Sequence, residues 1–411
     1  MAEMRPSRYP LVSVQTALDT IMAHVTPLGC ERVWLGDALG RVLARTLTAP
    51  VDVPAAPISG VDGYAVVAAA GVAPRRVVGE LTAGGQGSRP LGPDEAARIM
   101  TGAALPAGTD AVVMVEDTAE AAGVVTITAT PRVGDNVRPR AIDLKAGQTV
   151  LQPGTQLRSP EIGLLSSLGV LEVDVYRRPV VAVLATGDEV VDPWREPAPG
   201  QVRDSNRPAV LAAIAEAGGI PVSLGLARDD EALQTAMIRG GFERADVVIT
   251  SGGVSVGSRD LIKPILESLG QIHVGRVAVK PGKPLTFATV GSKLFFGLPG
   301  FPVSTLVTFE VFARPALLRM QGLAATRRPR VEVVLSEPVR PSPDRTEYQR
   351  AIVCYQDGAL RAVTTGVQVS SRLMSLVGAN ALIVIEPGTS LLPAGAKVPA
   401  FLTGELVDVP A

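Results

Sequence analysis

Short runs of β-branched and other apolar residues alternate with helix-like segments through the middle of the chain. The apolar runs predict buried strands at 180–185, 220–226, 247–249, 273–279 and 294–298. Helical patterns occur at 209–217 and 231–240, after the third run, and from Val303. Strands alternating with helices predict a doubly wound, mainly parallel sheet. In such sheets ligands bind outside the carboxyl ends of the strands, so we expect a site at that edge.

The hydrophobic pattern differs on both sides of this segment. Apolar residues at helical spacing from Val14 to Met22 predict an amphipathic helix near the N-terminus. A stretch rich in Val, Thr, Gly and Pro predicts an inserted β-rich domain, and short strand-like runs after Pro329 predict a compact β-barrel or sandwich. We therefore predict an α/β multidomain fold with flanking β-rich domains and a C-terminal β-barrel. The predicted boundaries are 1–26 (N-terminal helix), 27–54 with 144–176 (linking module), 55–143 (inserted domain), 177–327 (α/β domain) and 328–411 (barrel).

Composition narrows the classes of function. The chain has 411 residues, with 39 Lys plus Arg against 40 Asp plus Glu, so there is no basic excess to favour nucleic acid. Its 2 Trp, 5 Tyr and 8 Phe also argue against base-stacking surfaces. No apolar stretch approaches the ~20 residues that span a bilayer, and the N-terminus lacks the apolar core of a signal peptide.

Cysteine and histidine usage disfavours a zinc or non-haem iron site. Cys30 and Cys354 lie far apart and fit no metal-ligand spacing, and His24 and His273 are the only histidines. We expect a reduced cytoplasmic enzyme with neither a nucleic-acid nor a membrane partner.

A glycine-rich loop follows the strand predicted at 247–249. It comprises Ser251, Gly252, Gly253, Val254, Ser255, Val256 and Gly257, after which Ser258 can cap a helix. Free backbone N–H groups and the positive end of a helix dipole favour a phosphate or another oxyanion. The alternative is a structural turn. The length of the loop, its lack of bulky residues and the acid Asp260 at its end favour ligand binding.

Polar and glycine-rich clusters follow the other predicted strands as well. The same edge of the sheet should therefore gather Thr186, Gly187, Asp188 and Glu189, then Asp204, Ser205 and Asn206, then Asp229 and Asp230, then Lys280 and Lys283, and finally Pro299 and Pro302.

Three further motifs lie in the inserted segment. Asp62 stands between two glycines at the start of a strand, Thr101 precedes a glycine, and Arg138 with Asp143 lies where the insert rejoins the linking module. Taken singly, each fits a structural role, as a turn residue or as part of a solvated charged face.

Taken together, these motifs resemble one family, the molybdopterin molybdenumtransferases (MoeA), which are equivalent to the gephyrin E domain. The resemblance runs from the first helix to the C-terminal β module. It rests on Ser59–Ala65, Met100–Gly102, Arg138–Asp143, Thr186–Glu189, Asp204–Arg207, Arg228–Asp230, Ser251–Gly257, Lys280–Pro284 and Gly297–Gly300. One departure is Phe301, where family members usually carry Asn. That change puts the geometry of the loop and its choice of oxyanion in question.

The resemblance implies a reaction. Adenylylated molybdopterin and molybdate become molybdenum cofactor with release of AMP, in a step that uses a divalent cation, usually Mg²⁺. Carboxylates that face phosphates repel them unless such a cation lies between. We therefore assign Glu189 and Asp260, joined by Asp143 and Asp229 as further candidates, to Mg²⁺ binding or to activating water at the phosphoanhydride.

The anionic substrates suggest roles for the remaining motifs. Lys280 and Lys283 would neutralise phosphate or molybdate, and the backbone of 251–257 would bind phosphate. Asp62 and Thr101 match positions that the family uses for function. The other predicted substrate-binding residues are Thr186, Gly187, Asp188, Asp204, Ser205, Asn206, Pro299 and Pro302.

The family also implies a homodimer in which the C-terminal module closes the partner's site. Arg350 and Ser371 are the residues we expect to contribute, with a solvated surface as the alternative. A molybdopterin adenylyltransferase and molybdoenzyme-maturation proteins are candidate partners.

Two other functions fit part of the sequence. They are a molybdopterin adenylyltransferase and a nucleotide-pyrophosphate hydrolase, each of which would use only the doubly wound domain. A third is a gephyrin-like scaffold that binds receptor peptides. The choice between molybdate and tungstate stays open.

Overall fold

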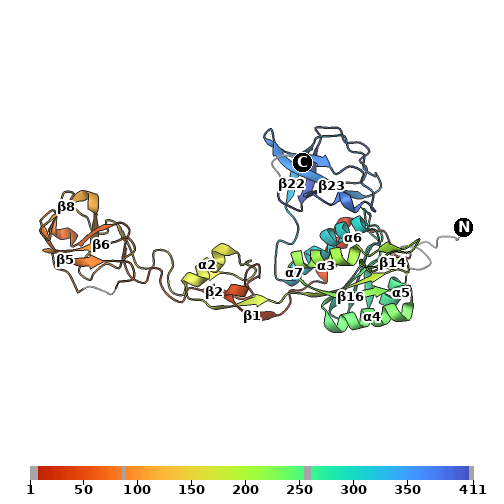
Figure 1. Cartoon of the computed structure of the whole chain (residues 1–411), viewed down its shortest axis with the longest axis horizontal. Helices are drawn as coiled ribbons and strands as arrows, with labels where there is room; N and C mark the ends of the chain where they lie inside the picture. Colours follow the sequence, from red (N-terminus) through yellow and green to blue (C-terminus); the bar gives the residue numbers. More distant parts are fainter. Residues whose placement is uncertain (1–7, 86–88, 254–260, 407–411) are drawn as a thin grey trace. The chain divides into compact units, whose positions relative to one another are not determined.

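The computed structural model describes residues 8–85, 89–253 and 261–406 (Figure 1). The chain forms two compact units. The first comprises Met1–Ala44, Gly154–Arg158 and Glu172–Ala411, and the second comprises Arg45–Pro153 and Ser159–Leu171. The linking module predicted from the sequence is thus divided between the two units.

A six-stranded sheet lies at the centre of the α/β domain in the first unit. The pairings among its first four strands are parallel, and the last two pairings are antiparallel because one strand, the fifth in the order, runs opposite to the rest; this confirms the predicted mainly parallel sheet. The order is β16 (Ile220–Ala227), β13 (Val180–Thr186), β17 (Val247–Ser251), β21 (Lys293–Leu298), β20 (Thr286–Val290) and β18 (Gln271–Val274).

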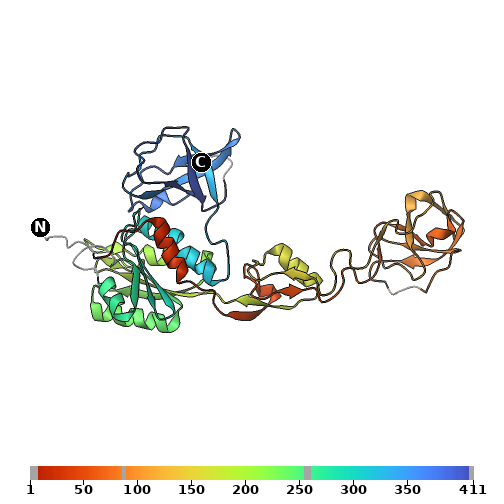
Figure 2. The same ribbon diagram turned by 180° about the vertical axis from the view of Figure 1, so that it is seen from behind.

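Helices cover both faces of this sheet (Figures 1 and 2). Alternate strand residues face opposite ways, so Val181 and Val183 pack in one core cluster while Ala182 and Leu184 pack in the other. The first cluster includes α1 (Val14–Ala23), α3 (Asn206–Glu216), α6 (Pro302–Thr308), the π-helical turn η4 (Phe309–Ala313) and α7 (Arg314–Met320). The second includes α4 (Glu231–Arg244) and α5 (Ile262–Leu269). This two-sided packing is the doubly wound arrangement.

The antiparallel part of the sheet differs from the sequence prediction. The single strand predicted at 273–279 is two strands, β18 and the two-residue β19 (Val279–Lys280), because Gly275 interrupts the run. The prediction also missed β20, which forms a hairpin with β21 around Gly291. Helix α3 begins three residues early, at Asn206, because the Asp204 carboxylate accepts the N–H of Arg207 (3.0 Å).

The C-terminal part of the first unit is a closed five-stranded barrel, as predicted. Pairing runs β23–β24–β22–β26–β25 and returns to β23, and β19 of the α/β domain adds to it through β23. The strands are β22 (Arg330–Leu335), β23 (Thr346–Gln356), β24 (Ala359–Thr364), β25 (Ala381–Ile385) and β26 (Lys397–Leu402), with the short helix η5 (Leu373–Ser375) between β24 and β25.

Smaller elements complete the first unit. They are β1 (Cys30–Trp34), paired with β12 (Glu172–Tyr176), the short helix η1 (Leu35–Asp37), and β14 (Val190–Val191), paired with β15 (Val202–Arg203).

The second unit is built on another six-stranded sheet, of order β7–β4–β6–β5–β9–β8. These strands are β4 (Gly63–Val66), β5 (Arg75–Leu81), β6 (Glu95–Ile99), β7 (Ala111–Met114), β8 (Thr118–Ala121) and β9 (Val124–Ile127). The unit also holds β2 (Leu47–Thr48), β3 (Ile58–Ser59), η2 (Ala68–Ala70), η3 (Val115–Asp117), β10 (Val137–Arg138), β11 (Thr149–Leu151) and α2 (Ser159–Ser167). Within the described ranges, no helix is long and apolar enough to cross a bilayer.

Candidate active site

Loops at the carboxyl ends of three parallel strands are bonded together. The Thr186 hydroxyl donates to the Ser251 carbonyl (3.3 Å), which joins the ends of β13 and β17. The Asn206 amide donates to the Ser251 hydroxyl (2.7 Å) and to the Gly300 carbonyl (2.6 Å), which adds α3 and the loop after β21. These bonds join the motifs of Thr186, Asn206 and Ser251 and the Gly300 loop at this edge, whereas Lys280 belongs to β19, which pairs with the barrel.

Gly252 shows how tightly these loops approach. Its φ of 94° lies in the left-handed region, and a Cβ there would come within 2.7 Å of the Thr186 carbonyl oxygen. Only glycine suits this position, because the backbone at the end of β17 lies in close contact with Thr186 at the end of β13. Ser255, Gly257 and Asp260, which we predicted to bind phosphate or Mg²⁺, lie outside the described residues.

A buried ion-pair network holds the start of α3. Arg207 donates to Asp204 (2.8 Å) and to Asp192 (2.7 Å), and Asp204 is 4% exposed. The neighbouring Ser205 is exposed and its side chain makes no capping hydrogen bond. Asn206 Oδ1 is buried and accepts no hydrogen bond from any described residue. An acceptor left in that state costs about 1–3 kcal/mol, so Asn206 offers a ligand an unused oxygen.

Three acidic residues lie at the ends of β13 and β16. The Glu189 carboxylate comes within 2.7 Å of the position that a Cβ on Gly187 would occupy. The Asp188 carboxylate accepts the N–H of Asp229 (3.1 Å). Throughout the described ranges, no group of three His, Cys, Asp or Glu side chains is placed to hold a metal ion. A cation bound here would therefore need further oxygen ligands.

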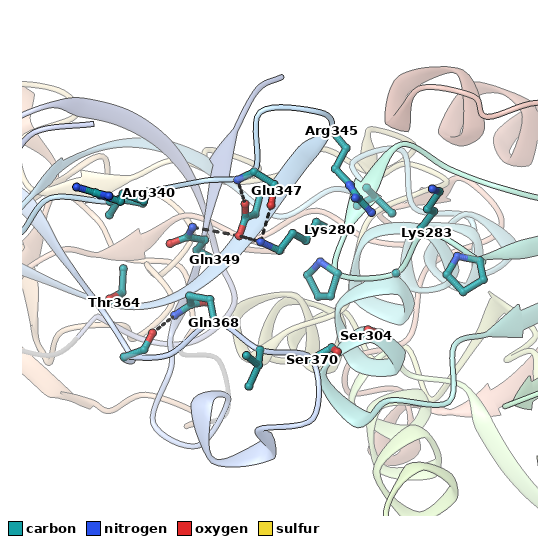
Figure 3. A pocket seen from close by; sticks show the side chains of 18 of the residues that line it. Lys280, Lys283, Ser304, Arg340, Arg345, Glu347, Gln349, Thr364, Gln368 and Ser370 are labelled. Atoms are coloured by element: carbon teal, nitrogen blue, oxygen red, sulfur yellow. Dashed lines mark hydrogen bonds and ion pairs between the residues drawn. The ribbon is translucent and has the colours of Figure 1, made fainter. Parts of the chain in front are cut away.

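A cavity of about 740 Å³ lies between the loop after β19 and the barrel (Figure 3). Four cationic side chains line it, together with hydroxyl and amide groups and one carboxylate. The cations are Lys280, Lys283, Arg340 and Arg345, the carboxylate is Glu347, and the neutral polar groups include Ser304, Ser342, Gln349, Gln368 and Ser370.

Charge in the cavity is unbalanced. Lys280 is paired with Glu347 (3.2 Å) and Arg345 with the neighbouring Asp344 (2.7 Å). Neither Lys283 nor Arg340 has an ion-pair partner among the described residues. The cavity therefore has an excess of positive charge, and it suits an anion.

The loop after β21 adjoins this cavity. The Pro299 carbonyl accepts the Thr305 hydroxyl (2.5 Å), and Pro302 is the first residue of α6. Phe301, between them, is exposed. The N–H of Val303 donates to the Ser370 carbonyl (3.1 Å), so the start of α6 is tied to the barrel loop that carries Ser371, itself exposed.

Arg350 is not at the surface, where a direct role at a partner's site would place it. It is 1% exposed, and its guanidinium donates to the Ser375 hydroxyl (3.0 Å) and the Val369 carbonyl (3.3 Å). Burial lowers the pKa of Arg350 to about 10, which still leaves it charged at neutral pH. In this structure Arg350 fixes the 365–376 loop, four of whose residues, Val369 among them, line the cavity.

Asp62, Thr101 and Asp143 belong to the second unit. The backbone N–H and the hydroxyl of Thr101 both donate to Asp62 (2.7 and 2.8 Å), and these bonds lower the pKa of Asp62. Asp143 is paired with Arg138 (3.0 Å), and both side chains are about half exposed. Asp62 is thus held as an ionised, accessible carboxylate.

Known proteins with similar sequences and structures cover nearly the whole chain. Three family models match successive parts: the MoeA N-terminal region (domain I and II) at 12–169, a probable molybdopterin binding domain at 182–319, and the MoeA C-terminal region (domain IV) at 332–402. The molybdopterin molybdenumtransferase of Haemophilus influenzae is 35% identical over 90% of this chain and 93% of that protein. The molybdopterin molybdenumtransferase of Nostoc sp. is 37% identical over 95% of this chain and 93% of that protein. The chain belongs to the MoeA family.

A solved structure supports this assignment. The molybdopterin biosynthesis MoeA protein from Pyrococcus horikosii superposes with a TM-score of 0.84 at 32% identity, covering 96% of this chain and all of that one. The family resemblance stated from the motifs is therefore confirmed.

The sequence motifs missed part of the cavity in this MoeA-family chain. Arg340, Arg345, Glu347, Gln349 and Gln368 line it but belong to none of the motifs. One signal in the sequence could have indicated two of them. Glu347 and Gln349 are two residues apart in a run with strand-like composition, and residues at that spacing face the same side of a strand. The positions of the cations Arg340 and Arg345 depend on the path of their loop, which the hydrophobic periodicity of the sequence does not predict.

Proposed function

We propose that this chain is a molybdopterin molybdenumtransferase that inserts molybdate into adenylylated molybdopterin and releases AMP with the help of Mg²⁺. Family membership makes it an enzyme of molybdenum cofactor biosynthesis. The observation that carries the rest of the proposal is the cavity lined by four cations beside a set of oxygen-rich strand ends.

The excess positive charge supports molybdate as the anion bound in the cavity. Lys283 has no ion-pair partner among the described residues, so its ammonium is available to a ligand. The hydroxyl and amide groups around it can donate to a tetrahedral oxyanion, or accept from a pterin. A volume of about 740 Å³ also exceeds the space one oxyanion needs, which leaves room for part of the organic substrate.

The strand ends supply oxygen ligands suited to Mg²⁺. Magnesium is usually held by one or two carboxylates together with substrate phosphates and water. Glu189 and Asp260 are the two carboxylates we propose for this role, and Asn206 Oδ1 is a neutral amide oxygen that has no hydrogen-bond partner among the described residues. When bound, Mg²⁺ neutralises charge at the phosphoanhydride. The chain's own groups would hold the phosphates at the start of α3 and along the backbone of the glycine loop.

The extent of the family match favours this function over the adenylyltransferase alternative. An adenylyltransferase built on the doubly wound domain would need only that domain. The matches at 12–169 and 332–402 cover the parts of the chain outside it. Part of the cavity wall also comes from the barrel.

Replacing Lys283 tests the molybdate site. We expect Lys283→Ala to raise the KM for molybdate in AMP release by about tenfold, the effect of losing one charge-assisted contact. Lys397→Ala is the matched control, because Lys397 pairs with Glu332 on an exposed face of the barrel. An unchanged KM in Lys283→Ala, at native melting temperature, would contradict the assignment of this cavity to molybdate.

We further propose that the enzyme works as a homodimer in the cytoplasm. Cell fractionation checks the location, and recovery of activity in the membrane fraction would contradict it.

A further inference from the structure

The segment of the α/β domain that carries Lys280 and Lys283 is joined to the barrel by a short β pairing. Strand β19 runs parallel to β23, with Val279 opposite Thr346 and Lys280 opposite Glu347. The Thr346 N–H donates to the Ala278 carbonyl (3.1 Å). Lys280 and Glu347 are therefore a cross-strand pair of opposite charge, and their backbones are fixed relative to one another.

Glu347 makes more contacts than an ordinary ion pair requires. Its side chain is 2% exposed and accepts from Lys280 (3.2 Å), from the Ser342 N–H (2.6 Å) and from the Gln349 amide (3.1 Å). A buried carboxylate is tolerated only when its oxygens are satisfied in this way. Glu347 thus connects Lys280 to the 340–345 loop, which carries the cavity cations Arg340 and Arg345 (Figure 3).

Two of the three N–H groups of Lys280 are committed by these contacts. One points to Glu347 Oε1, and a second donates to the Ser342 hydroxyl (2.6 Å). An ammonium has three donors, so one remains, and Lys280 lines the cavity. A free lysine samples many rotamers, whereas these two anchors fix the direction of the remaining donor before any ligand arrives.

We propose that Glu347, together with Ser342, is a positioning residue that aims the free N–H of Lys280 at one oxygen of the oxyanion. This inference rests on the proposed function. Glu347 acts through Lys280 rather than on the substrate, and its negative charge makes that role testable. If only charge mattered, removing the negative charge of Glu347 would strengthen anion binding. If Glu347 orients Lys280, removing it would weaken anion binding.

A double-mutant cycle separates positioning from simple support of the fold. The KM for molybdate is measured by AMP release for the wild type, Glu347→Gln, Lys280→Ala and the double variant. We expect Glu347→Gln to raise KM by about tenfold and to add nothing once Lys280 is absent, because coupled residues are non-additive. Ser342→Ala removes one anchor at a partly exposed position, so it provides the same test if Glu347→Gln does not fold.

Glu332→Gln is the control, since Glu332 pairs with Lys397 on the exposed side of the same barrel. Additive effects in the cycle, or a lower KM in Glu347→Gln, would overturn the positioning role while leaving the proposed function intact. Absence of molybdate-dependent AMP release in the wild type would instead refute the proposed function.

Discussion

At the scale of single residues, the chain holds polar side chains in defined states before substrate binds. Asp62 accepts two hydrogen bonds from Thr101, and both favour its ionised form. The Asn206 amide donates two hydrogen bonds to neighbouring loops, and its Oδ1 accepts none from the described residues. In each case local contacts orient the side chain and leave it able to accept a further hydrogen bond.

Asp62→Asn should reduce molybdenum insertion while leaving the affinity for adenylylated molybdopterin nearly unchanged. The substitution keeps the shape of the side chain and removes its charge, and the proposed phosphate-binding loop belongs to the other unit. Calorimetric affinity is measured beside cofactor yield at saturating molybdate. Equal losses of affinity and yield would place Asp62 in the nucleotide site, and an unchanged yield would make it a turn residue.

The sequence located the residues that follow parallel strands because strand direction alone brings them to one edge. Thr186, Ser251 and Asn206 could be placed together on that rule. Arg340 and Arg345 could not, because they lie on a loop whose path depends on the closure of the barrel. The burial of Arg350 could not be predicted either, because it depends on hydroxyl and backbone carbonyl acceptors that the fold brings to its guanidinium.

At the scale of elements, strands buried on both faces were the easiest to predict. The residues of β13 and β17 are almost all buried, and the apolar runs with which both strands begin stand out in the sequence. Strands β20, β24 and β26 were missed, because threonine, arginine or proline interrupts their apolar pattern. Such strands are defined by their partners more than by their own composition.

The start of β6 offers a test of element stability against pH. Glu95 accepts hydrogen bonds from Arg89 (2.6 Å) and Arg76 (2.6 Å), and its pKa is lowered to about 2, mainly by Arg89. Its pKa in the unfolded chain is higher, so the pairing stabilises the sheet above about pH 4.5 and is lost as pH falls toward 2.

Glu95→Gln should therefore remove part of this pH dependence. We expect the variant to be less stable than the wild type at pH 7, and the difference to shrink as the pH approaches 2. Thermal melts followed by circular dichroism across that range measure it. A difference independent of pH would show that Glu95 contributes through packing and not through charge.

At the scale of the whole molecule, three family regions in one chain combine an α/β domain, a barrel and an inserted β-rich domain. Family motifs identified this organisation from the sequence. The two segments predicted to form the linking module, 27–54 and 144–176, are joined by the pairings β1–β12 and β2–β11, of which the first lies in one unit and the second in the other. Those pairings join residues more than 100 positions apart, and local patterns do not encode which of them fall in which unit.

The proposed homodimer has a candidate contact on the barrel. Val367, Met374 and Val377 are exposed apolar residues within the segment 366–379 of the barrel, and a surface rich in exposed apolar groups often marks an interface. We expect light scattering at micromolar concentration to give twice the mass of one chain, and Met374→Glu to lower it. A fully active wild-type monomer would contradict the proposal.

The most direct test of the account is the dependence of AMP release on molybdate. Purified protein is mixed with adenylylated molybdopterin, and AMP is measured with and without molybdate and Mg²⁺. We predict release only when both are present, with one AMP for each molybdenum inserted. AMP release at the same rate without molybdate would mean that the chain hydrolyses the adenylate and is not a molybdenum transferase.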